Sequence, residues 1–282
     1  MMHPKLRGLT TCLLLVLASP AYAVTQLNMD IEVVDKGKTT KHSEIITFDA
    51  NRARFDFLAE GEQKTAKTPY LLTIDSGKNW IIGDTHEDKP SCVQVDIIEF
   101  FQKVGGALTT LDALVNPKID EPKLRKLLEG DGPKMMGFPT KHVQVQITTN
   151  AKASFLLKKY EYALKITDDI WYASNLEVHP IRKQWFQALS QTGYPLLDSI
   201  YDDWTKQIKG AVLKQDTVVE VTNVKRNSTS TQSQKAVITS IKELEPNEIE
   251  ATIFEVPECK KITKNQIRNT AADMFSEGRM SP

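Results

Sequence analysis

The sequence predicts an α+β protein in which a curved antiparallel sheet wraps around one long amphipathic helix, with an additional helical segment. Three observations carry this prediction. Apolar and polar residues alternate through the first third of the chain, apolar residues then recur every three or four positions, and the alternation returns afterwards.

The N-terminal residues 1–23 have the features of a cleavable secretory signal. Lys5 and Arg7 precede a mostly apolar run over residues 9–17, and Ala21 and Ala23 supply the small residues that signal peptidase requires. The apolar run is about half the roughly 20 residues that a membrane-spanning helix needs. We therefore expect cleavage after Ala23, a periplasmic location, and no membrane span in the mature chain.

The strands and turns of the first third predict an antiparallel β-meander of five strands. Apolar residues alternate with polar ones, and Gly, Asp and Asn cluster between the runs. The expected strands cover residues 26–34, 44–48, the segment with Phe55 and Phe57, 70–74 and 79–82.

A long amphipathic helix is predicted over residues 97–115, where the apolar positions step by three and four. Gly105 and Gly106 interrupt this stripe, which indicates either a bend or a close approach to another backbone. A shorter helix is expected over 121–129, capped by Asp120.

The rest of the chain predicts more strands around a second helical segment. We expect one domain over residues 24–262, with a helical insertion at about 181–209 and a C-terminal tail, 263–282, that is weakly helical. The expected strands are 140–147, 160–166, 170–173, 217–225 and 236–244, with a break in the helical segment at 193–195 and a solvated loop over 227–234.

Two cysteines, Cys92 and Cys259, remain after signal removal. In an oxidising compartment such a pair persists as a disulfide. No CxxC motif or neighbouring Cys/His cluster points to redox chemistry or a metal. We expect a structural disulfide that joins the first third of the chain to its end.

Composition and motifs argue against several classes of function. The chain has 36 Lys+Arg and 36 Asp+Glu residues, so it lacks the basic excess that nucleic acid requires. HExxH, GxSxG, P-loop and GxGxxG motifs are absent from the sequence. We therefore expect no metal, no cofactor and no catalytic residues. A hydrolase of dispersed residues that depends on His86 or His179 is the enzymatic alternative.

The apolar interior between sheet and helix is either filled by side chains or open as a ligand cavity, and the sequence does not decide between them. We hypothesise a non-catalytic protein that binds a lipid or another hydrophobic ligand. The alternative is an envelope interaction or structural module with a filled core, which would bind a protein partner. The expected lining is Met29, Ile31, Phe55, Phe57, Tyr70, Leu72 and Trp80 from the sheet, with Phe101, Val104 and Leu108 from the helix.

Four short stretches resemble the DUF4412-type uncharacterised exported proteins of bacteria. Those proteins are similar in architecture to the LolA-like lipoprotein carriers, whose fold is an incomplete antiparallel barrel closed by helices over an apolar cavity. The resemblance implies this half-barrel for residues 24–262 and assigns no functional residue. The stretches are Lys134-Met135-Met136-Gly137-Phe138-Pro139-Thr140, Asp169-Ile170-Trp171-Tyr172-Ala173, Gly193-Tyr194-Pro195 and Phe254-Glu255-Val256-Pro257.

Overall fold

The computed structural model describes residues 23–65, 68–84, 91–115, 117–155, 158–176 and 178–261. The predicted signal up to residue 22 and the predicted tail lie outside these ranges. The strands are β1 (Val24–Asp35), β2 (Lys38–Phe48), β3 (Ala53–Ala59), β4 (Tyr70–Thr73), β5 (Asn79–Asp84), β6 (Ser91–Asp96), β7 (Lys118–Ile119), β8 (Lys123–Asp131), β9 (Lys141–Phe155), β10 (Lys158–Ala173), β11 (Ala211–Asn223), β12 (Ser228–Leu244) and β13 (Lys260–Lys261), and the helices are α1 (Ile97–Val115), α2 (Pro180–Leu189) and α3 (Pro195–Thr205).

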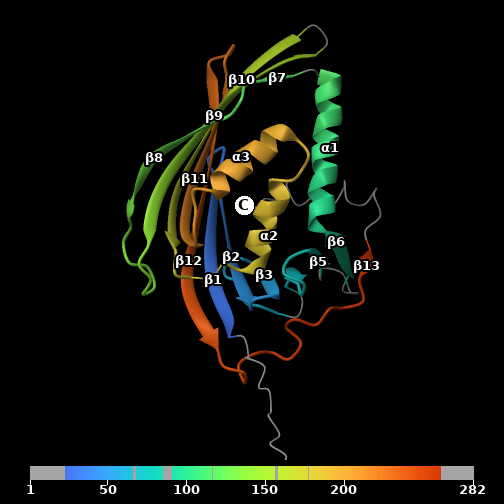
Figure 1. The fold of residues 1–282 in the computed structure, drawn as a ribbon, viewed down its shortest axis with the longest axis vertical. Coiled ribbons are helices and arrows are strands. Elements are labelled where there is room, and N and C mark those ends of the chain that lie inside the picture. Colours follow the sequence, from blue (N-terminus) through green and yellow to red (C-terminus); the bar gives the residue numbers. More distant parts are fainter. Residues whose placement is uncertain are drawn as a thin grey trace, which may run out of the picture.

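All described strands belong to one open 13-stranded sheet that curves around α2 and α3 (Figure 1). Strands β1 and β12 pair antiparallel at its centre and join the N-terminal half to the C-terminal half. Only β13 pairs in parallel, with β6. The path through the sheet runs β13-β6-β5-β4-β3-β2-β1-β12-β11-β10-β9-β7, and β8 pairs with β9 beside it.

The predicted meander is present in the N-terminal half, with one strand more than the sequence indicated. The alternation in β1 directs Leu27, Met29 and Ile31 to the concave face, and Leu27 pairs there with Ile46 of β2. The additional strand is β6, a short run that pairs with β5 directly before α1. Six strands therefore precede the first helix.

The sheet wraps around α2, and the predicted wrapping around the helix over 97–115 is not confirmed. That helix exists as α1, but it lies beside α2 at one side of the concavity (Figure 1). The N-terminal part of α1 buries Ile97 and Phe101, whereas residues 106, 107, 109 and 110 after Gly105 are exposed. In contrast, α2 buries seven of its ten residues, because the sheet and the other two helices surround it. A helix buried on several sides has no simple one-faced stripe, so its position is hard to predict from periodicity.

The glycine pair of α1 makes a close approach to another backbone at Gly105. A Cβ at Gly105 would lie 2.1 Å from the carbonyl oxygen of Thr192, in the loop between α2 and α3, whereas a Cβ at Gly106 would meet nothing within 4 Å. The absent side chain at Gly105 thus allows α1 to pack against this loop.

We predict opposite effects for alanine at these two neighbouring positions. Gly105→Ala should lower the free energy of unfolding by about 1–3 kcal/mol, because the clashing atom belongs to backbone. Gly106→Ala should raise it by about 0.5–1 kcal/mol through the better helix propensity of Ala. Urea denaturation measures both values. Equal changes in the two variants would contradict the packing of α1 on the loop at Thr192.

The predicted helix over 121–129 is wrong, because these residues form most of β8. This strand pairs antiparallel with β9, and its register shifts between Lys126 and Leu128. The shift breaks the two-residue period and produces a spacing that resembles a helix. Leu127 and Leu128 both remain exposed, so hydrogen bonding to β9, and not burial of an apolar stripe, determines the conformation.

The predicted loop over 227–234 is also wrong, because β12 already begins at Ser228. The turn between β11 and β12 spans residues 224–227, and Asn227 adopts a positive φ of 47° there. Thr222 and Thr229 form a cross-strand hydroxyl pair at 2.9 Å. Exposed Ser and Thr residues extend the hairpin beyond the core, where the alternation of apolar residues no longer marks a strand.

The predicted disulfide between Cys92 and Cys259 is confirmed, with a Cα–Cα distance of 4.9 Å. The chain after β12 runs below the sheet to β6, where this bond and β13 hold it (Figure 1). On the way, Ile253 is buried and the ring of Phe254 lies 4.4 Å from the Arg52 guanidinium. No helix in the described part of the chain combines the length and apolar character required to span a bilayer.

Candidate functional site

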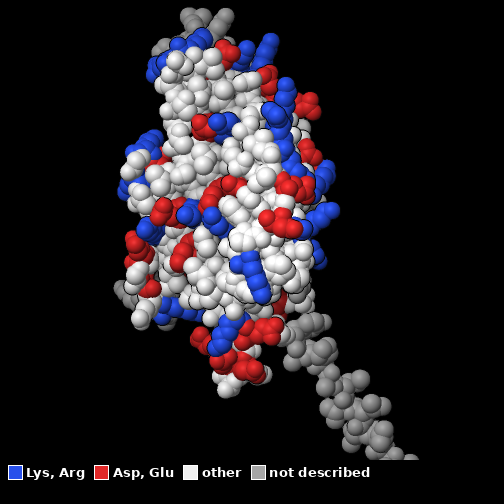
Figure 2. All heavy atoms as spheres, turned by 90° about the vertical axis from the view of Figure 1, so that its left-hand side faces the viewer, with Lys and Arg blue, Asp and Glu red and all other residues white. Residues whose placement is uncertain are grey.

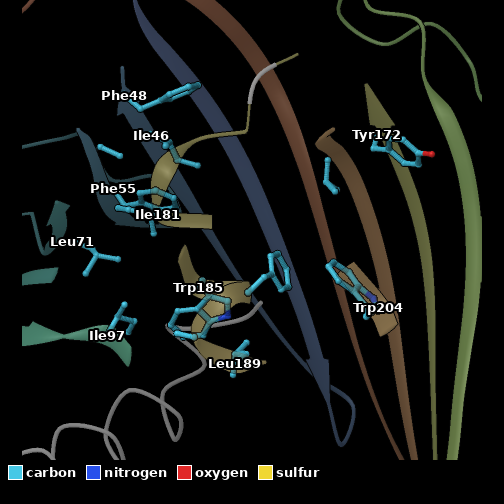
Figure 3. Packing of buried hydrophobic residues seen from close by; sticks show 14 of the residues in the cluster. Ile46, Phe48, Phe55, Leu71, Ile97, Tyr172, Ile181, Trp185, Leu189 and Trp204 are labelled. Atoms are coloured by element: carbon cyan, nitrogen blue, oxygen red, sulfur yellow. The ribbon is translucent and has the colours of Figure 1, made fainter. Parts of the chain in front are cut away.

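A cavity of about 120 Å³ lies between the concave face of the sheet and α2. Strands β1, β2 and β3 form one wall, β11 and β12 form another, and α2 covers the space between them. Figure 3 shows the packing on this side of the sheet, where Ile181 of α2 lies next to Ile46 and Phe55, and Trp185 and Leu189 follow further along the helix. The cavity therefore lies between side chains of both layers.

Aromatic rings line the end of the cavity near β5. Trp80 of β5 stacks on Trp185 of α2, with ring centroids 5.1 Å apart and an interplanar angle of 10°. Phe101 of α1 contacts Trp185 edge-on at 5.0 Å, one layer behind the cavity wall. The Trp80 indole donates to the Gly77 carbonyl, whereas the buried Nε1 of Trp185 has no hydrogen-bond partner among the described residues. An unpaired buried donor of this kind costs about 1–3 kcal/mol.

Glu44 of β2 places a carboxyl group in the apolar wall. Its side chain is buried, and it is the only acidic residue that lines the cavity. Burial raises the pKa of Glu44 to about 8. The nearest ionisable partner is His42, whose Nε2 lies 3.8 Å from Oε1 of Glu44 and whose pKa is itself lowered by burial. At neutral pH the Glu44 carboxyl is therefore mostly protonated.

The N-terminus of α2 is held at the cavity by His179. Its Nδ1 accepts a hydrogen bond of 3.0 Å from the backbone N–H of Arg182, which makes it the N-cap of the helix. Its ring also contacts Phe55 edge-on at 5.0 Å. Burial lowers the pKa of His179 to about 3, with a further contribution from the charge of Arg182. His179 therefore acts as a neutral structural cap.

A polar network connects α2 and α3 to the sheet next to the cavity. Arg182 Nη2 donates to Gln215 Oε1 at 3.4 Å, and Gln215 Nε2 donates to Asp168 Oδ1 at 3.2 Å. Asp168 also accepts from Trp204 Nε1 at 3.0 Å and from the Thr217 hydroxyl at 2.5 Å. The buried carboxylate of Asp168 thus has three donors and fixes Trp204 of α3 against β10 and β11.

Two further hollows adjoin the cavity and meet it at Phe186. One, of about 270 Å³, lies between α3 and the C-terminal strands, and the other, of about 950 Å³, is a groove along the exposed side of α2. Phe186 lines all three spaces. Its ring stacks on Trp204 at 4.6 Å. Phe186 is therefore a shared wall of the three spaces.

Five of the ten residues predicted to line a ligand cavity lie in its wall: Met29, Ile31, Phe55, Phe57 and Trp80. Tyr70 and Leu72 do not, because β4 pairs with β3 in the register that places Leu71 opposite Phe55. Leu71 therefore faces the cavity, and its two neighbours in β4 point to the other side of the sheet. The ring of Tyr70 lies there, 4.1 Å from the Arg54 guanidinium.

The three predicted lining residues of α1 also lie outside the cavity wall. Phe101 is buried behind Trp185, and Val104 and Leu108 are partly buried. This follows from the exchange of helices described above, since α2 occupies the place that the sequence assigned to α1. These three residues of α1 would contact a ligand only if the ligand displaced α2.

The polar residues of the site were missed by sequence reasoning. Glu44 has the same parity as Ile46 and Phe48 in β2, so the alternation alone would have placed it on the apolar face. Arg182 follows the cap residue His179 at the positive end of a helix, an unfavourable place for a cation. An acidic side chain on the apolar face of a strand and a cation at a helix N-terminus are both locally unfavourable. Such exceptions concentrate at functional sites.

The described residues contain no group of three or more His, Cys, Asp or Glu side chains arranged to hold a metal ion. Of the two histidines considered for hydrolysis, His179 is the cap of α2, and His86 lies outside the described residues.

No protein-family model matches the sequence, and a search of curated protein sequences gives no match. The resemblance to DUF4412-type proteins therefore stays a prediction. Solved structures that overlap with the chain include PNGF-II, with a TM-score of 0.38 and 10% identity over 87% of this chain, which spans 32% of that chain. A LolA superfamily protein from Nitrosomonas europaea overlaps with a TM-score of 0.29 and 6% identity, covering 84% of this chain and 91% of that one.

A putative outer membrane lipoprotein-sorting protein domain from Vibrio parahaemolyticus overlaps similarly, with a TM-score of 0.29, 8% identity, and coverage of 88% of this chain and 93% of that domain. TM-scores of this size describe a partial overlap in shape.

Proposed function

We propose that this is a non-catalytic protein of the periplasm that binds a hydrophobic ligand in the cavity between the sheet and α2. The observation that supports the proposal most is the unfilled space itself. Protein interiors pack closely, and voids larger than a water molecule are few. Here such a space lies among apolar residues contributed by eight elements, the strands β1 to β5, β11 and β12 and the helix α2.

The volume of the cavity determines which part of a ligand can enter it. An apolar cavity of about 150 Å³ stays dry and binds benzene, so the space of about 120 Å³ accepts the end of an alkyl chain or a small ring. Each methylene group that moves from water into it gains about 0.8 kcal/mol. A longer chain requires Phe186 to move and open the adjoining hollows.

Two independent features support the proposed location. The N-terminal residues have the pattern of a secretory signal, and the Cys92–Cys259 disulfide requires an oxidising compartment to persist. Since β1 begins at Val24, the predicted cleavage after Ala23 leaves the first strand intact.

Tryptophan quenching tests ligand binding in this cavity. Dodecanol with a terminal bromine atom should quench the fluorescence of Trp80 and Trp185, which line the wall. Ala236→Phe places a ring into the cavity from β12 and should weaken binding at least about tenfold, because it removes space for roughly two methylene groups. Fluorescence titration below the micelle concentration measures both effects.

Val237→Phe is the matched control, because Val237 is the next residue on β12 and does not line the cavity. It should leave binding unchanged. Equal binding by wild type and Ala236→Phe would place the ligand elsewhere. The absence of any quenching would favour the module with a filled core.

A further inference from the structure

We propose that the ligand is a single-chain anionic amphiphile, and that Arg182 binds its carboxylate or phosphate head group where the apolar cavity meets the groove along α2. This inference rests on the proposed function and specifies the chemical class of its ligand. Three observations support it: the place and unused donors of Arg182, the charge of the groove, and the position of Arg182 on its helix.

Arg182 lies at the junction of the two spaces. It lines both the cavity and the groove, and its guanidinium lies 5.3 Å from the centroid of the Phe186 ring. Among the described residues its side chain has one hydrogen bond, the long contact to Gln215, and no ion pair within 4 Å. A guanidinium carries five N–H donors in a planar fork that matches a carboxylate or phosphate. Most of these donors remain available to a ligand.

The described residues that line the groove carry positive charge only. They include Lys78, Arg182 and Lys183 and no acidic residue. Elsewhere both signs mix, as on the outer face of the sheet in Figure 2, and the whole chain is balanced. The one acid in the adjoining cavity, Glu44, is mostly protonated at neutral pH because burial raises its pKa to about 8. The combined space therefore favours an anion.

The position of Arg182 on α2 gives independent support. Arg182 and Lys183 lie at the N-terminal end of the helix, where the helix dipole is positive, and no acidic residue lies in the first turn. Burial lowers the pKa of Arg182 to about 10, although the nearby Asp168 opposes this effect. Asp168 accepts hydrogen bonds from three neutral donors, and among the described residues it forms no direct ion pair with Arg182. An oxyanion bound at Arg182 would compensate its charge and also interact favourably with the helix terminus.

The proposed arrangement also orients the chain. With the head group at Arg182, the alkyl end extends into the cavity toward Trp80 and Trp185, away from the solvent-exposed groove. A free phosphate ion would use the same fork but would gain nothing from the apolar wall.

Displacement of brominated dodecanol tests the inference with four competitors of equal chain length: dodecanoate, dodecyl phosphate, dodecanol and dodecyltrimethylammonium. Wild-type protein should bind the two anions at least about tenfold more tightly than dodecanol, the range of a charge-assisted hydrogen bond. Inorganic phosphate should not displace the probe. Arg182→Gln should bind the anions as weakly as dodecanol and keep its affinity for dodecanol.

Arg226→Gln is the matched control, because Arg226 is exposed in the turn before β12 and lines neither space. It should retain the preference for anions. Arg182→Lys keeps the charge and loses the planar fork, so it should retain part of this preference. It replaces Arg182→Gln in the test if Arg182→Gln does not fold.

The outcomes separate the two proposals. Equal affinity of wild type for dodecanoate, dodecanol and the ammonium compound would overturn the role of Arg182 and leave the cavity as a binding site. Displacement by inorganic phosphate as strong as by dodecyl phosphate would also overturn it. Failure of all four chains to bind would overturn the proposed function itself.

Discussion

Glu44→Gln is expected to make the protein more stable than wild type at pH 8, by up to about 5 kcal/mol, and to leave stability nearly unchanged at pH 4.5. The value corresponds to a carboxyl pKa raised from 4.5 to about 8. The cause is burial of Glu44 in the cavity wall, where the ion-pair partner among the described residues is His42, with its Nε2 3.8 Å from Oε1 of Glu44. Glutamine keeps the shape and cannot ionise.

The direction of this effect follows from linkage. The folded state holds the proton of Glu44 more tightly than the unfolded state, so the contribution of the neutral carboxyl is fully present below pH 4.5. It is lost as the pH rises to about 8. His179 has the opposite slope, because its pKa is lowered from 6.5 to about 3, and its contribution is lost as the pH falls through that range.

Urea denaturation from pH 4 to pH 9 measures both profiles. The free energy of unfolding of wild type should change little between pH 4.5 and pH 6.5, where the contributions of Glu44 and His179 have opposite slopes, and should fall between pH 6.5 and pH 8. The profile of Glu44→Gln should lack this fall, and it should instead decrease as the pH drops below 6.5, where the unfolded chain takes up a proton on His179 and the folded protein does not. Parallel profiles of the two proteins above pH 5 would show that Glu44 is ionised in the folded state.

Removal of the disulfide by the double variant Cys92→Ser/Cys259→Ser is expected to lower the free energy of unfolding by about 5 kcal/mol. The bond closes a loop across a sequence separation of 167 residues. In the chain-entropy model such a loop restricts the unfolded chain strongly and leaves folded contacts unchanged. Neither cysteine lines the cavity, so ligand binding should persist under conditions in which the variant is folded.

Denaturation of the oxidised wild type, the reduced wild type and the double variant tests this value. The two forms without the bond should agree with each other and differ from the oxidised protein. A loss below about 1 kcal/mol would contradict the chain-entropy estimate and would show that the bond restricts the unfolded chain much less than a free loop of this length implies.

Much of the fold follows from local pattern. The strands β1 to β5, the bounds of α1 and the break between α2 and α3 were predictable, because alternation, helical spacing and Gly193-Tyr194-Pro195 are signals within short windows. Strand β8 was not predictable, because its conformation depends on pairing with β9. The choice of α2 over α1 as the enclosed helix depends on contacts between distant elements, which one sequence does not reveal.

The candidate site was predictable only in part for a related reason. Met29 and Phe57 follow from the alternation of single strands. The choice between Leu71 and Leu72 requires the register between β3 and β4, and a shift of one residue reverses every side chain. The proposed role of Arg182 could not be predicted from the sequence, because it depends on the position of Arg182 between the groove and the cavity.

Crystals grown with dodecanoate that carries bromine at the chain end would show whether the space between the sheet and α2 receives the apolar end of a ligand. We expect the anomalous scattering of bromine to give a peak between Met29, Phe57 and Trp185, with the carboxylate at Arg182. A bromine peak outside this space, with the cavity unchanged and empty, would show that the ligand does not bind there.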